Sequence, residues 1–216
     1  KLHDLSMKLE TNKNYVYNEW AESYDDYVNK FEYNGPHELV RLINLYKCHF
    51  EGDTISVLDF GCGTGLLAEA FCLFRNNLSS DNDVTNIIGV DISEKMLEKS
   101  RLRNIYTNLS FLDITGEHEP KEVLDKLRAP GDGFDLIMSC GVFLEGHVSL
   151  AEIDRMILKL VKKGGVLAFT VRHSFMESEE NIIIDLLQRC DITILAKARI
   201  NYLKGVEAWA IIIKRL

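Results

Sequence analysis

Three glycines at alternate positions follow a short apolar run and an acidic residue. Asp59 lies two residues before Gly61, and Gly63 and Gly65 complete the pattern. Glycine lets the backbone turn tightly and approach a ligand without a Cβ in the way. A helical pattern of apolar residues begins directly afterwards. Strand, glycine turn and helix in this order are typical of a crevice that binds a nucleotide.

The spacing of the glycines narrows the class of ligand. A dinucleotide-binding turn has the pattern G-x-G-x-x-G, which would place the third glycine at position 66, where Leu66 stands. The acidic residue before the first glycine suits a cationic ligand better than a pyrophosphate. The motif therefore argues against a nicotinamide dinucleotide.

Residues 55–65 read ISVLDFGCGTG, which resembles motif I of the class I S-adenosylmethionine (SAM)-dependent methyltransferases. The resemblance implies that this loop lies under the methionine part of SAM and that Asp59 stands near its ammonium group, directly or through water. It assigns the loop residues Gly61, Cys62, Gly63 and Gly65 to cofactor binding.

Two further acidic residues end the next two apolar runs. Asp91 stands ~20 residues beyond the glycines plus the length of a polar insertion, where a ribose-binding acid is expected. The alternative is an acid at the start of a helix that Ser93 caps. By resemblance, Asp113 accepts a hydrogen bond from the adenine amino group, and the amide of Ile114 meets a ring nitrogen. Ile92 and Met96 flank the adenine in this scheme, although both side chains also suit a core.

Residues 134–143, FDLIMSCGVF, resemble motif IV of the same methyltransferases. The resemblance implies that Ser139, Cys140 and Gly141 line the region of the sulfonium and its methyl group. Asp135, at the start of the strand, is assigned a structural role. Cys140 as a nucleophile is a weaker alternative, because no partner base lies nearby in the sequence.

Three more residues are candidates for contacts at the site. His147 follows motif IV and is the candidate catalytic base, against the alternative of a surface histidine. Arg172 ends the next strand and is a candidate for binding an anionic substrate group, or for capping the sheet. Tyr24 lies in W-x-x-x-Y-D, which many small-molecule methyltransferases carry on a helix over the SAM site; its alternative is a place in a core stripe.

The elements that must position these residues alternate between strand and helix. Apolar residues from Val16 to Phe31 recur every three or four positions, which predicts an amphipathic helix, and Pro36 can open a second one. Strands are expected at 55–58, 86–90, 109–112, 134–138 and 166–171, with helices from 66, from 93, around 153–160 and around 183–190. The β-rich runs 192–202 and 206–214 are joined by three residues and should pair antiparallel.

The fold class follows from this order. We expect an α/β, Rossmann-like class I methyltransferase fold: a seven-stranded, mostly parallel sheet with a C-terminal antiparallel hairpin and helices on both faces. Residues 1–14 are expected to be flexible. Residues 15–216 are expected to form one methyltransferase domain, with an N-terminal helical lid (15–50) and a sheet core (51–216). The polar stretch 76–86 is an insertion.

Composition limits the partners. The 216 residues carry a net charge of −8, which argues against an extended contact with nucleic acid or an anionic membrane. Five cysteines without a C-x-x-C pair predict no disulfide framework and no metal site. No apolar run approaches the ~20 residues of a membrane span, and the first residues lack a signal-peptide core. We expect a cytoplasmic protein, with the nucleus as the alternative.

Within the class, four segments most resemble the Williams–Beuren-region methyltransferase-like group: WAESYD (20–25), YNGP (33–36), EGHV (145–148) and FTVR (169–172). Motif IV lacks the N/D-P-P-Y/F of amino-directed nucleic-acid methyltransferases. The sequence thus predicts methyl transfer from SAM, with S-adenosylhomocysteine as product, to a small-molecule or peptide-like acceptor. A non-catalytic SAM-binding regulator and a nicotinamide-dependent oxidoreductase remain alternatives. The acceptor and the oligomeric state are not encoded in these motifs.

Overall fold

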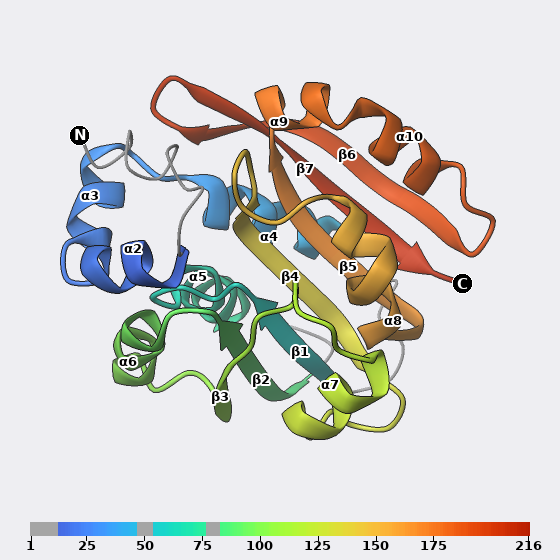
Figure 1. Ribbon diagram of the computed structural model, residues 1–216, viewed down its shortest axis with the longest axis horizontal. Coiled ribbons are helices and arrows are strands. Elements are labelled where there is room, and N and C mark those ends of the chain that lie inside the picture. Colours follow the sequence, from blue (N-terminus) through green and yellow to red (C-terminus); the bar gives the residue numbers. More distant parts are fainter. Residues whose placement is uncertain (1–12, 47–53, 77–82) are drawn as a thin grey trace.

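A sheet of seven strands runs through the part of the chain that the computed structural model describes, residues 13–46, 54–76 and 83–216 (Figure 1). Its strand order is β3-β2-β1-β4-β5-β7-β6. The strands are β1 (Thr54–Phe60), β2 (Asp83–Asp91), β3 (Asn108–Phe111), β4 (Phe134–Phe143), β5 (Val161–Arg172), β6 (Ile192–Leu203) and β7 (Val206–Arg215).

The first five strands are parallel and the last two form the predicted antiparallel hairpin. β7 pairs antiparallel with both β5 and β6, so it lies between them in the sheet. β1 pairs with β2 on one side and with β4 on the other. After β1, the chain builds β2 and β3 on one side of it and then crosses to β4 on the other side. Open α/β sheets bind ligands at the carboxyl ends of the strands where the connections change direction in this way.

Successive side chains of the buried strands point to two separate apolar layers. Val57 packs among residues of α4 and α5, whereas Leu58 packs among residues of the helices on the opposite face. The first face is covered by α4 (Gly35–Leu45) and α5 (Leu66–Asn76). The second is covered by α7 (Pro120–Leu127), η2 (Ile153–Ile157), α8 (Leu158–Leu160), α9 (His173–Ser178) and α10 (Glu180–Leu187). Helices thus lie on both faces, as predicted.

The N-terminal part differs from the single amphipathic helix predicted for residues 16–31. It forms two helices, α2 (Lys13–Trp20) and α3 (Tyr24–Lys30), separated by a turn that ends at Ser23. The buried indole of Trp20 packs edge-on against the rings of Tyr24 and Tyr27, with centroids 4.9 and 5.2 Å apart. Asp25, at the start of α3, accepts hydrogen bonds from outside the helix. These tertiary contacts compensate for the intrahelical bonds lost at the turn.

Other differences concern element bounds. β4 runs on to Phe143 and β5 begins at Val161, both beyond the predicted apolar runs, because ladder hydrogen bonds depend on the neighbouring backbone as well as on side-chain pattern. α7 and α9 were not predicted. α6 (Glu94–Leu102) begins after the cap Ser93, as predicted. None of the described helices combines the length and apolar character needed to cross a bilayer.

Two predictions fall largely on residues that the structure does not describe. Residues 1–12 of the terminus predicted to be flexible lie outside the described ranges, and residues 13 and 14 begin α2. Residues 77–82 of the predicted insertion also lie outside them.

Candidate functional site

A cavity of about 460 Å³ lies at the carboxyl ends of β1 and of its two neighbours in the sheet, β2 and β4. Its volume is in the range of small-molecule and cofactor sites. Segments far apart in the sequence meet around it, and it is lined by Tyr17, Tyr24, Phe60, Gly61, Gly63, Val90, Asp91, Ile92, Met96, Phe111, Leu112, Asp113, Ile114, Thr115, Cys140, Gly141, Val142, His147 and Val148.

The glycine loop forms the part of the wall between β1 and α5. Gly61 and Gly63 have φ angles of 69° and 54°, which favour glycine. A Cβ on Gly61 would lie 2.2 Å from Cγ2 of Val142, whereas one on Gly63 would meet no atom within 4 Å. Packing therefore requires glycine at position 61, and Gly63 leaves open space beside its backbone for a ligand.

Asp91 connects the glycine loop to the start of α6. Its Oδ2 accepts a hydrogen bond from the amide of Gly63 at 2.8 Å, and its Oδ1 accepts one from the amide of Ser93 at 2.9 Å. Desolvation raises the pKa of this carboxyl to about 6, although the backbone donors favour its ionised form. The amide of Ile92 also acts on this carboxylate, which has about four acceptor positions, so it keeps capacity for a donor of a ligand in the cavity.

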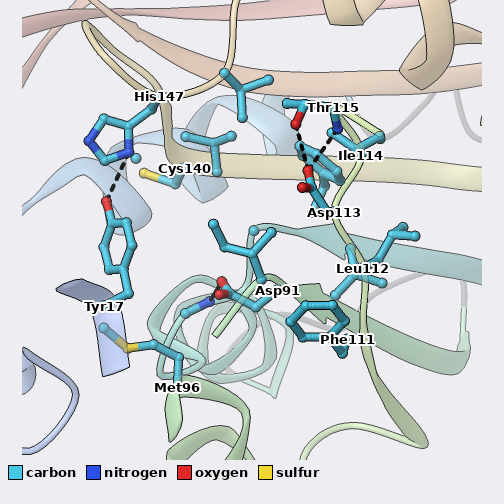
Figure 2. Close-up of a pocket in the computed structure, with 18 of the residues that line it drawn as sticks. Tyr17, Asp91, Met96, Phe111, Leu112, Asp113, Ile114, Thr115, Cys140 and His147 are labelled. Atoms are coloured by element: carbon cyan, nitrogen blue, oxygen red, sulfur yellow. Dashed lines mark hydrogen bonds between the residues drawn. The ribbon is translucent and has the colours of Figure 1, made fainter. Parts of the chain in front are cut away.

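One end of the cavity is apolar and edged by Asp113. Figure 2 shows Asp113, Ile114, Leu112 and Phe111 together at this end, with Asp91 nearer the middle. Oδ1 of Asp113 accepts hydrogen bonds from the amide and the hydroxyl of Thr115, at 3.0 and 2.6 Å. This turn holds the carboxyl at the cavity edge.

The other end carries aromatic and sulfur groups. Tyr17 of α2 and Tyr24 of α3 reach it from the N-terminal helices, and His147 reaches it from the loop after β4. The hydroxyl of Tyr17 and Nδ1 of His147 lie 3.0 Å apart in a hydrogen bond drawn in Figure 2. His147 is thus half-buried at the cavity rather than a surface side chain.

Cys140 lies within a hydrogen-bonded cluster at this same end. Its Sγ is 3.2 Å from the hydroxyl of Tyr33, which is itself 3.1 Å from that of Tyr202, and the hydroxyl of Thr170 donates to it at 3.6 Å. Burial raises the pKa of the Cys140 thiol to about 12. The thiol is therefore protonated at neutral pH, which is unfavourable for the alternative of a nucleophile.

The remaining predicted site residues do not line the cavity. Ser139 is buried and donates its hydroxyl to the carbonyl of Phe60 at 2.9 Å, which joins β4 to β1. The amide of Cys62 bonds to the carbonyl of Val90, and Gly65 packs against Arg103. Asp59 is 1% exposed behind the loop, and Arg172 stands at the end of β5.

Several residues that hold the loop were not singled out from the sequence. Arg103, at the end of α6, donates to the carbonyl of Thr64 and pairs with Asp25 of α3 and Glu69 of α5, at 2.7 and 2.5 Å. The hydroxyl of Ser100 donates to the carbonyl of Gly63 at 2.7 Å. Their sequence signal is weak, because polar residues on an amphipathic helix usually indicate a solvated face.

Comparison with known families settles the class of the domain. A family model described as a methyltransferase domain matches residues 51–196. The chain belongs to this family of methyltransferase domains. The matched region contains every strand from β1 to β5 and therefore the carboxyl ends that surround the cavity.

Curated relatives of this methyltransferase domain act in quinone synthesis. The chain is 31% identical over 128 residues to the ubiquinone biosynthesis O-methyltransferase of Neisseria meningitidis serogroup A, covering 59% of this chain and 48% of that protein. It is 32% identical over 111 residues to the enzyme of the same name from Pseudomonas aeruginosa, covering 50% and 40%. The chain thus spans about half the length, or less, of these relatives.

Solved structures share the fold at low sequence identity. A SAM-dependent methyltransferase from Clostridium acetobutylicum matches with a TM-score of 0.61 and 17% identity, covering 92% of this chain and 98% of that one. Magnesium protoporphyrin IX methyltransferase from Synechocystis, solved with bound SAM, matches with a TM-score of 0.60 and 15% identity, covering 96% and 99%. The seven-stranded fold is therefore that of methyltransferases of known structure.

The electrostatics of Asp59 generate a prediction about stability. Burial raises the pKa of this carboxyl from 3.8 to about 7, against a 2.7 Å hydrogen bond from the Tyr106 hydroxyl that lowers it. The folded state then holds a proton that the unfolded state releases near its ordinary pKa. The contribution of Asp59 to the free energy of unfolding therefore falls as the pH rises from about 4 to about 7, and stays constant above.

We expect Asp59→Asn to remove this part of the pH dependence. Relative to the parent, the variant should gain on the order of 2–4 kcal/mol between pH 4 and pH 8, since one pKa unit corresponds to about 1.36 kcal/mol. Urea unfolding of both proteins across that range measures the difference. Asp132→Asn, in an exposed turn, is the control, and parallel stability curves for the parent and Asp59→Asn would contradict the prediction.

Proposed function

We propose that this methyltransferase domain binds SAM in the 460 Å³ cavity and transfers its methyl group to a small-molecule acceptor. The observation that carries the proposal is the convergence of Gly61, Gly63, Asp91 and Asp113 on one cavity at the carboxyl ends of the strands, within a chain of the methyltransferase family. The names of the curated relatives and the SAM bound to a protein of the same fold support it.

The adenosine part of SAM is assigned to the apolar end of the cavity. In this scheme, the carboxylate of Asp91 binds the ribose hydroxyls, and Asp113 and the amide of Ile114 bind the edge of the adenine. Ile92 and Met96, which line the cavity as proposed, flank the ring. Phe111, also in the cavity wall, adds an aromatic surface that the sequence did not single out.

The methionine part is assigned to the glycine loop, residues 61–65. Open space beside Gly63 supports this assignment. Asp59 lies behind the loop, so we propose that it acts on the ammonium group through water, as one of the two routes that the sequence left open. Tyr24, Cys140 and Gly141 surround the position proposed for the methyl group, whereas Ser139 supports that wall from behind through Phe60.

SAM supplies a methyl group that its sulfonium already activates, so the protein mainly has to orient the acceptor and exclude water. The half-buried rings of Tyr17 and Tyr24 serve this purpose at the end of the cavity opposite Asp113. We propose His147 as the base that takes the acceptor proton, with Tyr17 fixing the orientation of the imidazole. An acceptor that attacks as a neutral lone pair would not need it.

Residues 15–50 are proposed to act as a helical lid over the core 51–216. Contacts of the described part support this: Tyr17 and Tyr24 line the cavity, and Asn18 accepts a hydrogen bond from the Ser93 hydroxyl at 2.7 Å. The WAESYD segment thus meets the site from outside the sheet, which supports our assignment to the Williams–Beuren-region methyltransferase-like group.

The acceptor is proposed to be small, and the location cytoplasmic. The net charge of −8 disfavours bulk nucleic acid as a substrate. The described cysteines Cys62, Cys140 and Cys190 are free thiols, which supports a reducing compartment.

Isothermal titration calorimetry with SAM, S-adenosylhomocysteine and NAD tests the cofactor. We expect binding of the first two only, and a stabilisation of about 2.7 kcal/mol at a ligand concentration 100 times the dissociation constant. Methyl transfer to a component of a metabolite extract then separates an enzyme from a non-catalytic SAM-binding regulator. Binding of NAD alone would overturn the proposal, and efficient methylation of bulk tRNA or DNA would overturn the small acceptor.

Asp91→Ala should weaken the binding of S-adenosylhomocysteine more than a substitution of any other single carboxylate. The variant loses the carboxylate that accepts from the ribose and releases the Gly63 amide. Hydrogen bonds to charged groups contribute about 1.5–3 kcal/mol each. The expected loss of affinity is on the order of tenfold to a few hundredfold. Glu94→Ala, an exposed carboxylate three residues further on, is the control. Unchanged affinity in Asp91→Ala would exclude the ribose assignment.

His147→Ala should lower kcat for the acceptor found in the extract while leaving the affinity for S-adenosylhomocysteine unchanged. General base catalysis contributes about 10²- to 10⁴-fold, so a drop in that range is expected. Tyr17→Phe, which removes only the hydroxyl that orients the imidazole, should cost less. His37→Ala on α4 is the matched control. Full activity in His147→Ala would show that the acceptor needs no base from this residue.

A further inference from the structure

Arg172 is the last residue of β5, next to the strand that carries Cys140 and Gly141. It is half-buried, and its Nε is enclosed without a hydrogen-bond partner. Within the described residues, its guanidinium makes no hydrogen bond and no ion pair. Arg103, also half-buried, instead pairs with the two carboxylates of Asp25 and Glu69. A partly desolvated cation without a counter-ion is costly, which is a reason to expect an anion there in the working protein.

The strand geometry directs this side chain to the acceptor end of the cavity. Residues two apart in a strand share a face, so Arg172 lies on the same side of β5 as Thr170. Thr170 donates to Cys140 and accepts a hydrogen bond from the amide of Gly141, and both of these residues line the cavity. Arg172 is therefore two residues further along the same face of β5, beyond the position proposed for the methyl group.

Three tyrosines lie near enough to Arg172 to feel its charge. Burial raises the pKa values of Tyr17, Tyr24 and Tyr202, and the positive charge of Arg172 acts in the opposite direction on all three. The charge is thus close to two rings that line the cavity and to the Tyr33–Tyr202 pair beside Cys140. The hydroxyls stay protonated at neutral pH; that of Tyr17 bonds to His147 and that of Tyr202 to Tyr33, so Tyr24 is the candidate donor beside the cation.

We propose that Arg172 binds an anionic group of the methyl acceptor, a carboxylate or a phosphate. This inference rests on the proposed function, because the acceptor end is defined by placing adenosine at the Asp113 end. The planar guanidinium can give two parallel hydrogen bonds to such a group, and a tyrosine hydroxyl can supply a third. The acceptor is then a small organic anion, held by its charged group while its nucleophilic atom lies near Cys140 and His147.

Titration with simple anions tests the site before the acceptor is known. Acetate, inorganic phosphate and the neutral analogue acetamide are added at constant ionic strength to the free protein and to its complex with S-adenosylhomocysteine, and binding is followed by NMR. We expect saturable binding of acetate or phosphate to the complex, and none of acetamide. The anion with the higher affinity indicates whether the acceptor carries a carboxylate or a phosphate.

Variants connect the binding to the guanidinium. Arg172→Met should lower the affinity for the anion at least tenfold, and Arg172→Lys should retain part of that affinity. Arg199→Met is the matched control, because Arg199 lies exposed on β6 and pairs with Glu207. If Arg172→Met does not fold, the affinities of Arg172→Lys and the parent for the anion are compared instead. Equal affinities would then overturn the proposal.

Equal anion binding by the parent and Arg172→Met, or no saturable binding by the parent, would overturn the proposal. A loss of tenfold or more in affinity for S-adenosylhomocysteine in Arg172→Met would also overturn it, because the guanidinium would then hold the cofactor's own carboxylate. If the parent binds no S-adenosylhomocysteine, the proposed function fails, and the anion titration of the free protein still decides whether Arg172 is an anion site.

Discussion

The backbone of the glycine loop is held by hydrogen bonds from two sides, and the cavity depends on them. Asp91 accepts the amide of Gly63, while Ser100 and Arg103 donate to the carbonyls of Gly63 and Thr64. Glycines are free to adopt many conformations, so a loop that contains three of them needs such external bonds to keep one shape. The same Arg103 also pairs with Asp25 of α3, so the loop and the N-terminal helices are fixed by one side chain.

The sequence predicted those features that are local or periodic. The alternation of strands and helices, the antiparallel hairpin and the position of the glycine loop follow from apolar runs and from residues with special backbone freedom. The break between α2 and α3 could not be predicted, because the apolar stripe continues across Ser23 and the contacts that fix α3 come from Thr64 and Arg103, far away in the sequence.

The candidate site likewise divides into residues that the sequence could predict and residues that only the fold brings to the loop. Acids at strand ends, such as Asp91 and Asp113, were found because topology alone brings strand ends together. The side chains behind the loop were missed, since Ser100 and Arg103 look like solvated positions of a helix until the fold places the loop against them. Ser139 was taken as a cavity residue from its motif, but its place in the pleat turns the hydroxyl toward the carbonyl of Phe60.

The two ends of the cavity differ in composition: one wall is mainly backbone and the other is mainly side chains. Around the glycine loop, the cavity wall is main chain, and the side chains of Asp91, Ser100 and Arg103 hold its shape. At the other end, the wall consists of side chains from the N-terminal helices, the end of β4 and the loop after β4, and Tyr33, Thr170 and Tyr202 pack behind it. Point mutations can therefore reshape one half without disturbing the other. Such a division lets a lineage acquire new specificities in small steps while it keeps a constant framework.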